Sequence, residues 1–150
     1  MAEKKGSRRL GRKYAFQVLY GLNFVPVEGD RGLVRAFEAG LSTCAGGKKS
    51  SRGHEFSWEL VSGVWERAQN LDAIIARFSR HWKLRRIAKV ELAILRLALF
   101  EILFCDDTPA KVAINEAVEL AKKFGDENSK NFVNGILDAV AKALEQGEQF

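Results

Sequence analysis

Two short stretches of this sequence combine positive charge with an aromatic ring. Near the N-terminus Tyr20 follows a run of basic residues, and near the C-terminus Phe132 follows Lys130 and Asn131. Cations attract the phosphates of a nucleic acid, and an exposed aromatic ring can stack on an unpaired base. Residues of these types at these spacings could therefore bind a single strand of nucleic acid.

The net positive charge of the chain is concentrated in residues 1–13. Six of the 24 basic residues lie there with one of the 19 acidic residues, Glu3, so the remaining residues hold 18 of each sign. The six basic residues are Lys4, Lys5, Arg8, Arg9, Arg12 and Lys13. Such a concentrated basic arm favours a polyanionic partner. The alternative is a disordered, solvated tail.

The basic arm continues into a helix predicted from Arg8 to about Asn23, with Ser7 as its N-cap. The residues that share one stripe of this helix, at about 100° per residue, are Arg9, Lys13, Phe16 and Tyr20, with Arg12 and Gln17 beside them. This stripe offers both phosphate attraction and a surface for base stacking. The alternative is that its rings belong to the core, which is our interpretation of Phe16.

The last predicted helix, capped by Asp126 or Asn128, contains a turn signal, Asn134-Gly135, in its middle. Apolar residues nevertheless continue through it at helical spacing. Because glycine costs a helix roughly 1 kcal/mol relative to alanine, we expect a neighbouring helix to approach Gly135 closely. Phe132 lies about 80° from the centre of the apolar stripe. Its ring belongs either to the margin of the core or to a surface left open for a ligand.

Long periodic stretches and only two prolines predict an all-α bundle of about seven helices. The predicted helices cover approximately residues 8–23, 30–41, 54–69, 71–79, 81–102, 109–124 and 129–145. Asp30 caps the second, Phe56 faces inward on the third, Thr108 caps the sixth, and Gly125 ends the sixth as a left-handed residue.

The segment 81–102 opens a helix that is apolar on nearly every side, which places it at the centre of the bundle. Its Arg96 and Glu101 need partners or the surface, because an unpaired buried charge is very costly. They are therefore candidates for structural ion pairs. Glu91 is less constrained, and we expect it to face outward.

Several classes of protein are excluded by what the sequence lacks. The longest apolar region, residues 87–104, is interrupted by charged residues, so no membrane span is predicted. The basic N-terminus lacks the apolar run of a signal peptide, which indicates a cytoplasmic protein. Cys44 and Cys105 lie outside any CxxC pattern, so we interpret them as reduced structural cysteines and expect no metal site or cofactor.

The loop 45–53 contains Gly47-Lys48, which resembles a phosphate-binding loop only superficially. That motif requires a glycine five positions before the pair, and Ser42 stands there instead. We therefore interpret residues 45–53 as a polar linker.

Three stretches resemble the NusB family of transcription antitermination factors: RKYAFQVLY (12–20), VELAILRLALFEI (90–102) and VAINEAVELAKKFGDENSKNFVNGILD (112–138). The resemblance spans essentially the whole chain and is weakest in residues 24–55. It implies a compact fold of two packed helical halves. It also implies one RNA-binding domain over residues 1–150, in which residues 1–13 form a basic arm.

The resemblance further implies a function. The family binds the boxA element of ribosomal RNA transcripts, here expected to be single-stranded, together with a small-subunit ribosomal protein called NusE. That heterodimer helps RNA polymerase read through terminators, and it has no catalytic activity. The residues that match the family's RNA-binding positions are Arg8, Arg9, Arg12, Lys13, Gln17, Tyr20, Lys130, Asn131 and Phe132. Glu91 matches a position that meets the protein partner.

The sequence departs from the family at two positions near these residues. Leu10-Gly11 stands where members often continue with arginine or alanine, which suggests an arm that orders on binding RNA. Asn128 stands where an acidic residue is common, which would raise RNA affinity. Two alternative functions are an accessory RNA-binding subunit for ribosomal RNA methylation and a purely structural protein adaptor. A homodimer that covers the RNA-binding face is also left open.

Overall fold

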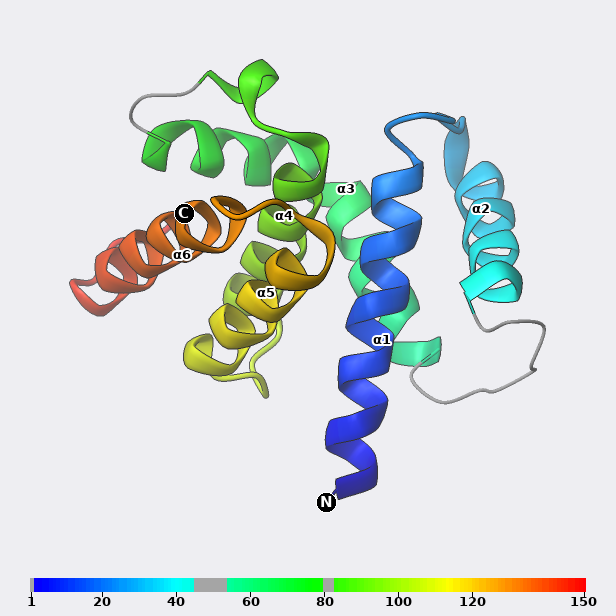
Figure 1. Cartoon of the computed structure of the whole chain (residues 1–150), viewed down its shortest axis with the longest axis horizontal. Coiled ribbons are helices and arrows are strands. Elements are labelled where there is room, and N and C mark those ends of the chain that lie inside the picture. The colour runs from blue at the N-terminus through cyan, green and yellow to red at the C-terminus, as the bar shows by residue number, and fades with distance from the viewer. Residues whose placement is uncertain (1, 45–53, 80–82) are drawn as a thin grey trace. The chain divides into compact units, whose positions relative to one another are not determined.

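The computed structural model describes residues 2–44, 54–79 and 83–150. The predicted linker 45–53 and the first two residues of the predicted helix 81–102 lie outside these ranges. The described residues form six α-helices, one short 3-10 helix and no strand, which confirms the all-helical prediction (Figure 1). They are α1 (Ala2–Gly21), α2 (Gly29–Cys44), α3 (His54–Phe78), η1 (Leu84–Arg86), α4 (Lys89–Phe104), α5 (Ala110–Phe124) and α6 (Ser129–Glu145).

The chain divides into two compact units, one up to Trp65 and one from Glu66 onward, and α3 contributes to both. Two helices were predicted here, over about residues 54–69 and 71–79, and α3 consists of two helical segments joined across a kink. Neither proline nor glycine occurs between Val64 and Phe78 to end a helix. The kink lies at a single residue, Arg67, which departs from helical geometry (φ −111°, ψ 15°) a few residues before the predicted boundary.

In the first unit α1 begins at Ala2, so the predicted cap at Ser7 is wrong. Residues 2–5 are strong helix formers, and no residue before Ser7 forces the helix to start there. The chain turns after α1, and α2 returns alongside it (Figure 1). A Cβ atom added to Gly40 of α2 would lie 2.7 Å from Cγ2 of Val18. Glycine at this position therefore permits the close packing of α2 on α1.

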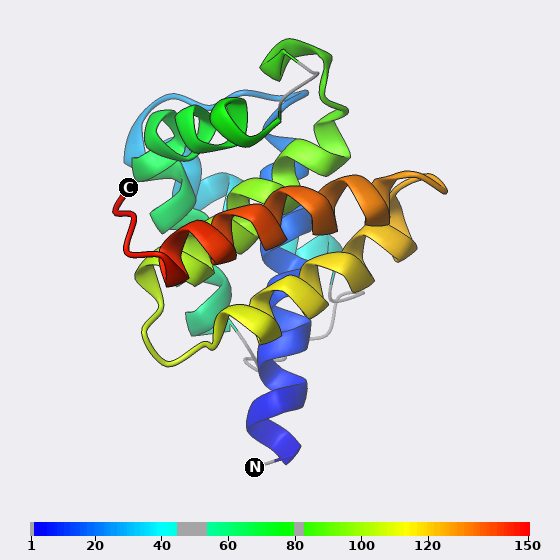
Figure 2. The same cartoon turned by 90° about the vertical axis from the view of Figure 1, so that its left-hand side faces the viewer.

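In the second unit α4 is buried along most of its length, as its sequence predicted. The antiparallel helices α5 and α6 both pack on it (Figure 2). Arg96 of α4 donates to both carboxylate oxygens of Asp72, with Nε–Oδ1 and Nη2–Oδ2 distances of 2.6 and 2.7 Å. This pair confirms the interpretation of Arg96 as a structural ion pair. Glu101 is buried and does not lack a partner.

Both ends of α5 differ from the prediction. The helix begins at Ala110, so Pro109 rather than Thr108 occupies the N-cap position. Gly125 was predicted to be left-handed but is extended (φ −96°, ψ −172°). A Cβ atom there would lie 2.5 Å from Cβ and Oγ of Ser129 and 2.8 Å from the carbonyl oxygen of Ala121. Glycine is therefore required by a close approach and not by a positive φ.

Asn128 occupies the N-cap position of α6 but makes no side-chain capping hydrogen bond, and the capping contacts come from Asp126, the other predicted residue. Its Oδ1 accepts hydrogen bonds from the N–H groups of Asn128 and Ser129 at 2.9 and 3.1 Å. Ser129 Oγ accepts in return from the N–H of Asp126 at 3.0 Å. The predicted close approach at Gly135 is wrong, because a Cβ atom there would meet no heavy atom within 4 Å and the residue is exposed.

Candidate nucleic-acid interface

The predicted stripe of α1 divides between surface and core. Arg9 is exposed, whereas Lys13, Gln17 and Tyr20 are half-buried, as is Arg8, which was predicted to bind RNA but lies outside the stripe. The remaining two side chains are buried: Arg12 is 5% exposed and Phe16 is 1% exposed. The interpretation of Phe16 as core is confirmed. Cations of α1 and the ring of Tyr20 therefore reach the surface from one helix.

Tyr20 is held by the rings on either side of it along the chain. Its ring stacks on Phe16, with centroids 5.8 Å apart and an interplanar angle of 13°. Phe24 meets Tyr20 edge-on at 5.1 Å and 78°. Phe24 is 57% exposed. Sequence reasoning missed it as a candidate, although its position four residues after Tyr20 would place both rings on one side of a helix.

The basic end of α1 is joined to the start of α3. The Arg8 and Arg12 guanidinium carbons lie 4.7 and 5.3 Å from the ring centroid of Phe56, within the range of a cation–π contact. Ser57 Oγ, which is buried, donates a 2.6 Å hydrogen bond to the carbonyl oxygen of Gly11. Sequence reasoning placed Phe56 in the core and did not single out Ser57. The contacts of Phe56 and Ser57 with α1 depend on the packing of α3 against α1, which no local sequence pattern predicts.

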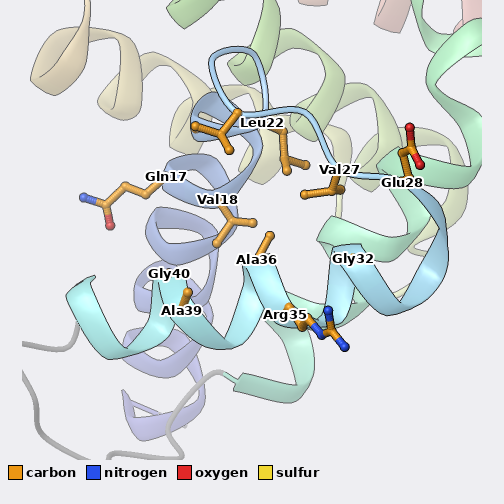
Figure 3. A pocket seen from close by; sticks show the side chains of 12 residues that line it. Gln17, Val18, Leu22, Val27, Glu28, Gly32, Arg35, Ala36, Ala39 and Gly40 are labelled. Atoms are coloured by element: carbon orange, nitrogen blue, oxygen red, sulfur yellow. The ribbon is translucent and has the colours of Figure 1, made fainter.

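One buried polar atom lies beside this surface of α1, the side-chain oxygen of Gln17. Its Oε1 is buried, and it accepts no hydrogen bond from the part of the chain that the structure describes. In Figure 3 this side chain extends away from the apolar residues around it. Gln17 itself is half-buried and lies four residues after Lys13 and three before Tyr20, so its amide is suited to bind a polar group, such as a base edge.

A hollow of about 840 Å³ lies between α1 and α2 (Figure 3). Its lining is mostly apolar and includes Val18, Leu22, Val27 and Ala36. The two charged residues in its lining, Glu28 and Arg35, have opposite signs. The hollow therefore does not extend the basic face of α1.

In the second unit the start of α6 carries the other predicted residues. Lys130 and Asn131 are exposed, and Phe132 is half-buried. The exposed Gly135 follows within one helical turn of Phe132. A cation, an amide and a partly accessible ring thus occupy consecutive positions of α6. Because α1 and α6 belong to different units, one surface that joins them stays a prediction.

Glu91 lies in the first turn of α4 and is half-buried rather than facing outward as expected. Its Oε1 accepts a hydrogen bond from Ser129 Oγ at 3.4 Å. Burial raises the pKa of the Glu91 carboxyl, and the negative charge of Asp126 raises it further, while the Ser129 hydrogen bond acts in the opposite direction. The carboxylate of Glu91 is therefore a destabilised charge close to the turn between α5 and α6.

The described residues contain neither a group of metal ligands nor a membrane-spanning helix. No three His, Cys, Asp or Glu side chains in the ranges 2–44, 54–79 and 83–150 come together in a group that could hold a metal ion. None of the described helices combines the length and the apolar character needed to cross a membrane. Cys105 is buried and forms no disulfide among the described residues.

Comparison with known proteins places this arrangement in a family. Residues 9–142 match the model of the NusB family. The transcription antitermination protein NusB of Oleidesulfovibrio alaskensis is 53% identical over 146 residues, covering 94% of this chain and 91% of the relative. The structure of T. maritima NusB is 36% identical, with a TM-score of 0.79 and 90% of each chain covered. A structure of antitermination factors NusB and NusE in complex with dsRNA is 27% identical, with a TM-score of 0.79, covering 91% of this chain and 97% of that chain.

Proposed function

Because this chain belongs to the NusB family, we propose that it is a transcription antitermination factor. In this role it binds boxA RNA of ribosomal RNA transcripts together with the ribosomal protein NusE. The complex then promotes read-through by RNA polymerase in the cytoplasm. The role is one of binding and needs no catalysis by this chain.

The observation that carries the proposal is the composition of α1. This helix holds all of the chain's excess positive charge, and a half-buried tyrosine lies on the same helix. Arg8, Arg9 and Lys13 are partly or fully accessible and are assigned to phosphate contacts. Arg12 is nearly buried, so it adds positive potential close to Phe56 rather than reaching outward.

The rings and amides are assigned to the bases. Tyr20 and Phe132 stack on unpaired bases, which is worth roughly 1–3 kcal/mol for each base. Gln17 and Asn131 donate or accept hydrogen bonds at base edges and so contribute sequence preference. Lys130 adds a phosphate contact at the start of α6.

Glu91 is assigned to the contact with NusE. Its carboxylate is already partly desolvated in the free protein and has Ser129 as its hydrogen-bond partner. A cationic group of the partner would stabilise this charge, because it would offset both the burial of the carboxyl and the nearby charge of Asp126.

The test is a titration of labelled RNA followed by fluorescence anisotropy, with and without NusE. Single-stranded boxA RNA, a scrambled single strand and a boxA duplex are compared, because stacking on Tyr20 and Phe132 requires unpaired bases. We expect the single-stranded boxA RNA to bind most tightly. With about four phosphates engaged, the logarithm of affinity should fall with the logarithm of salt concentration at a slope near −3. Equal affinity for boxA and scrambled RNA with NusE present would contradict the proposal.

A further inference from the structure

One aromatic ring of α3 lies beside two arginines of α1. Arg8 and Arg12 are four residues apart, so their guanidinium groups project from successive turns of one helix face. Both lie within 5.3 Å of the same Phe56 ring centroid, at 4.7 and 5.3 Å. Phe56 therefore contacts Arg8, which is assigned to a phosphate contact, and Arg12, which adds positive potential beside it.

This arrangement opposes two unfavourable effects. Like charges four residues apart on a helix repel each other. Arg12 is also 5% exposed, and removing a guanidinium from water is costly without compensating contacts. The face of an aromatic ring attracts cations and does so more strongly where water is excluded. The ring thus allows both positive charges to stay close together before any phosphate arrives.

A second contact fixes the backbone of α1 at the same place. The carbonyl oxygen of Gly11, the residue directly before Arg12, accepts the 2.6 Å hydrogen bond from Ser57 Oγ. Gly11 is buried and has no side chain, so Ser57 can reach the backbone there. Phe56 and Ser57 are consecutive residues, and together they fix the α1 segment that carries Arg8 and Arg12.

We propose that Phe56 is a positioning residue for RNA recognition, an inference that depends on the proposed function. Its ring orients Arg8 and Arg12 in the free protein. RNA then does not have to order the long side chain of Arg8 when it binds, and such ordering lowers affinity. Phe56 itself does not contact RNA.

If Phe56 orients the arginines, its loss should lower RNA affinity without changing the number of phosphate contacts. Without the Phe56 ring, both arginines keep their charges and Arg8 can still reach a phosphate, but its side chain is less well oriented before binding. We expect Phe56→Leu to weaken RNA binding by about tenfold, in line with the ordering of one or two rotamer-rich side chains. The salt slope should stay unchanged, because the slope counts the phosphates that are neutralised. Arg8→Gln, by contrast, should reduce the slope by about 0.7.

The experiment compares Phe56→Leu with Phe56→Trp, which retains an aromatic face and should retain both the affinity and the slope. The matched control is Phe78→Leu. It removes another contact between a ring and an arginine, Arg77 at 5.1 Å, that the proposed interface does not use. This control should leave RNA affinity unchanged. The melting temperature of each variant is measured alongside, and Phe56→Met replaces Phe56→Leu if the leucine variant does not fold.

A second readout needs no RNA. Protons of the Arg8 and Arg12 side chains lie close to the Phe56 ring, so their NMR signals should be shifted by its ring current. These shifts should persist in Phe56→Trp and disappear in Phe56→Leu. Unshifted arginine signals in the wild-type protein would overturn the proposed contact.

The two proposals fail in different ways. If wild-type protein does not distinguish boxA from scrambled RNA, the proposed function fails and the role of Phe56 in RNA recognition fails with it. If wild-type protein does distinguish them but Phe56→Leu binds with wild-type affinity, only the positioning role is overturned. A reduced salt slope in Phe56→Leu also overturns it, because phosphate contacts themselves would then have been lost.

Discussion

Two glycines ten residues apart should respond oppositely to the same substitution. At Gly135 an added Cβ meets no heavy atom within 4 Å, and the residue is exposed within α6. Alanine is preferred to glycine in a helix by roughly 1 kcal/mol, so Gly135→Ala should raise the free energy of unfolding by about 0.5–1 kcal/mol. Its methyl group disturbs no packing in the described structure.

At Gly125 the same methyl group would lie 2.5 Å from Cβ and Oγ of Ser129 and 2.8 Å from a backbone oxygen of α5. Real Cβ contacts essentially never come so close, so the chain between α5 and α6 must shift. That shift disturbs the capping hydrogen bonds between Asp126 and Ser129. Steric overpacking typically costs about 1–3 kcal/mol, and Gly125→Ala should destabilise the protein by this amount.

The two variants are compared with wild type by urea denaturation followed by circular dichroism, and by their melting temperatures. In a chain of this length 1 kcal/mol corresponds to a shift of about 2–4 °C. We expect a higher midpoint for Gly135→Ala and a lower one for Gly125→Ala. A destabilised Gly135→Ala would show that the open space at α6 is occupied, and an unaffected Gly125→Ala would show that the α5–α6 turn tolerates a side chain.

Three further predictions concern single side chains. Phe132→Ala should weaken RNA binding by an amount equivalent to about 1–3 kcal/mol. It should lower the free energy of unfolding by less than the roughly 3–5 kcal/mol that removal of a fully buried phenylalanine costs. A drop in melting temperature as large as that cost implies would identify the ring as core. Asp72→Asn should cost about 1–3 kcal/mol in urea denaturation, because it weakens a two-point, partly buried pair with Arg96, and a loss below 0.5 kcal/mol would count against that pair. Glu91→Gln should raise the melting temperature at pH 7. The pKa of Glu91 is raised in the folded state, so the wild-type protein loses stability as pH rises and the carboxyl ionises, whereas glutamine stays neutral. This gain should vanish below the ordinary carboxyl pKa of 4.5, and a gain that is independent of pH would refute the assignment.

Much of the fold could be predicted from local patterns. The apolar segment around α4 predicted a central helix because polar residues were too few to form an exposed face. The requirement of Arg96 for a partner followed from the cost of burying a charge, but its identity as Asp72 did not, since Asp72 lies on a different helix. Phe16 was interpreted correctly as core from its place in the stripe.

Helix ends and glycines were predicted less well. The sequence predicted a left-handed backbone at Gly125 and a close approach of another helix at Gly135, and the structure shows neither. Both reasons are common for glycine, but which one applies depends on the neighbouring atoms in space. Asp126, by contrast, caps α6 as predicted, because a side-chain cap is a local contact within three residues.

The sequence by itself determined the helical class, the concentration of positive charge in residues 1–13 and the resemblance to the NusB family. These properties depend on residue types, spacing and order along the chain. Only the tertiary structure placed Arg8 and Arg12 over Phe56 and Ser57 against Gly11. The reason is physical: these contacts join residues more than 40 positions apart, and they form only when α1 and α3 pack together to bury their apolar faces.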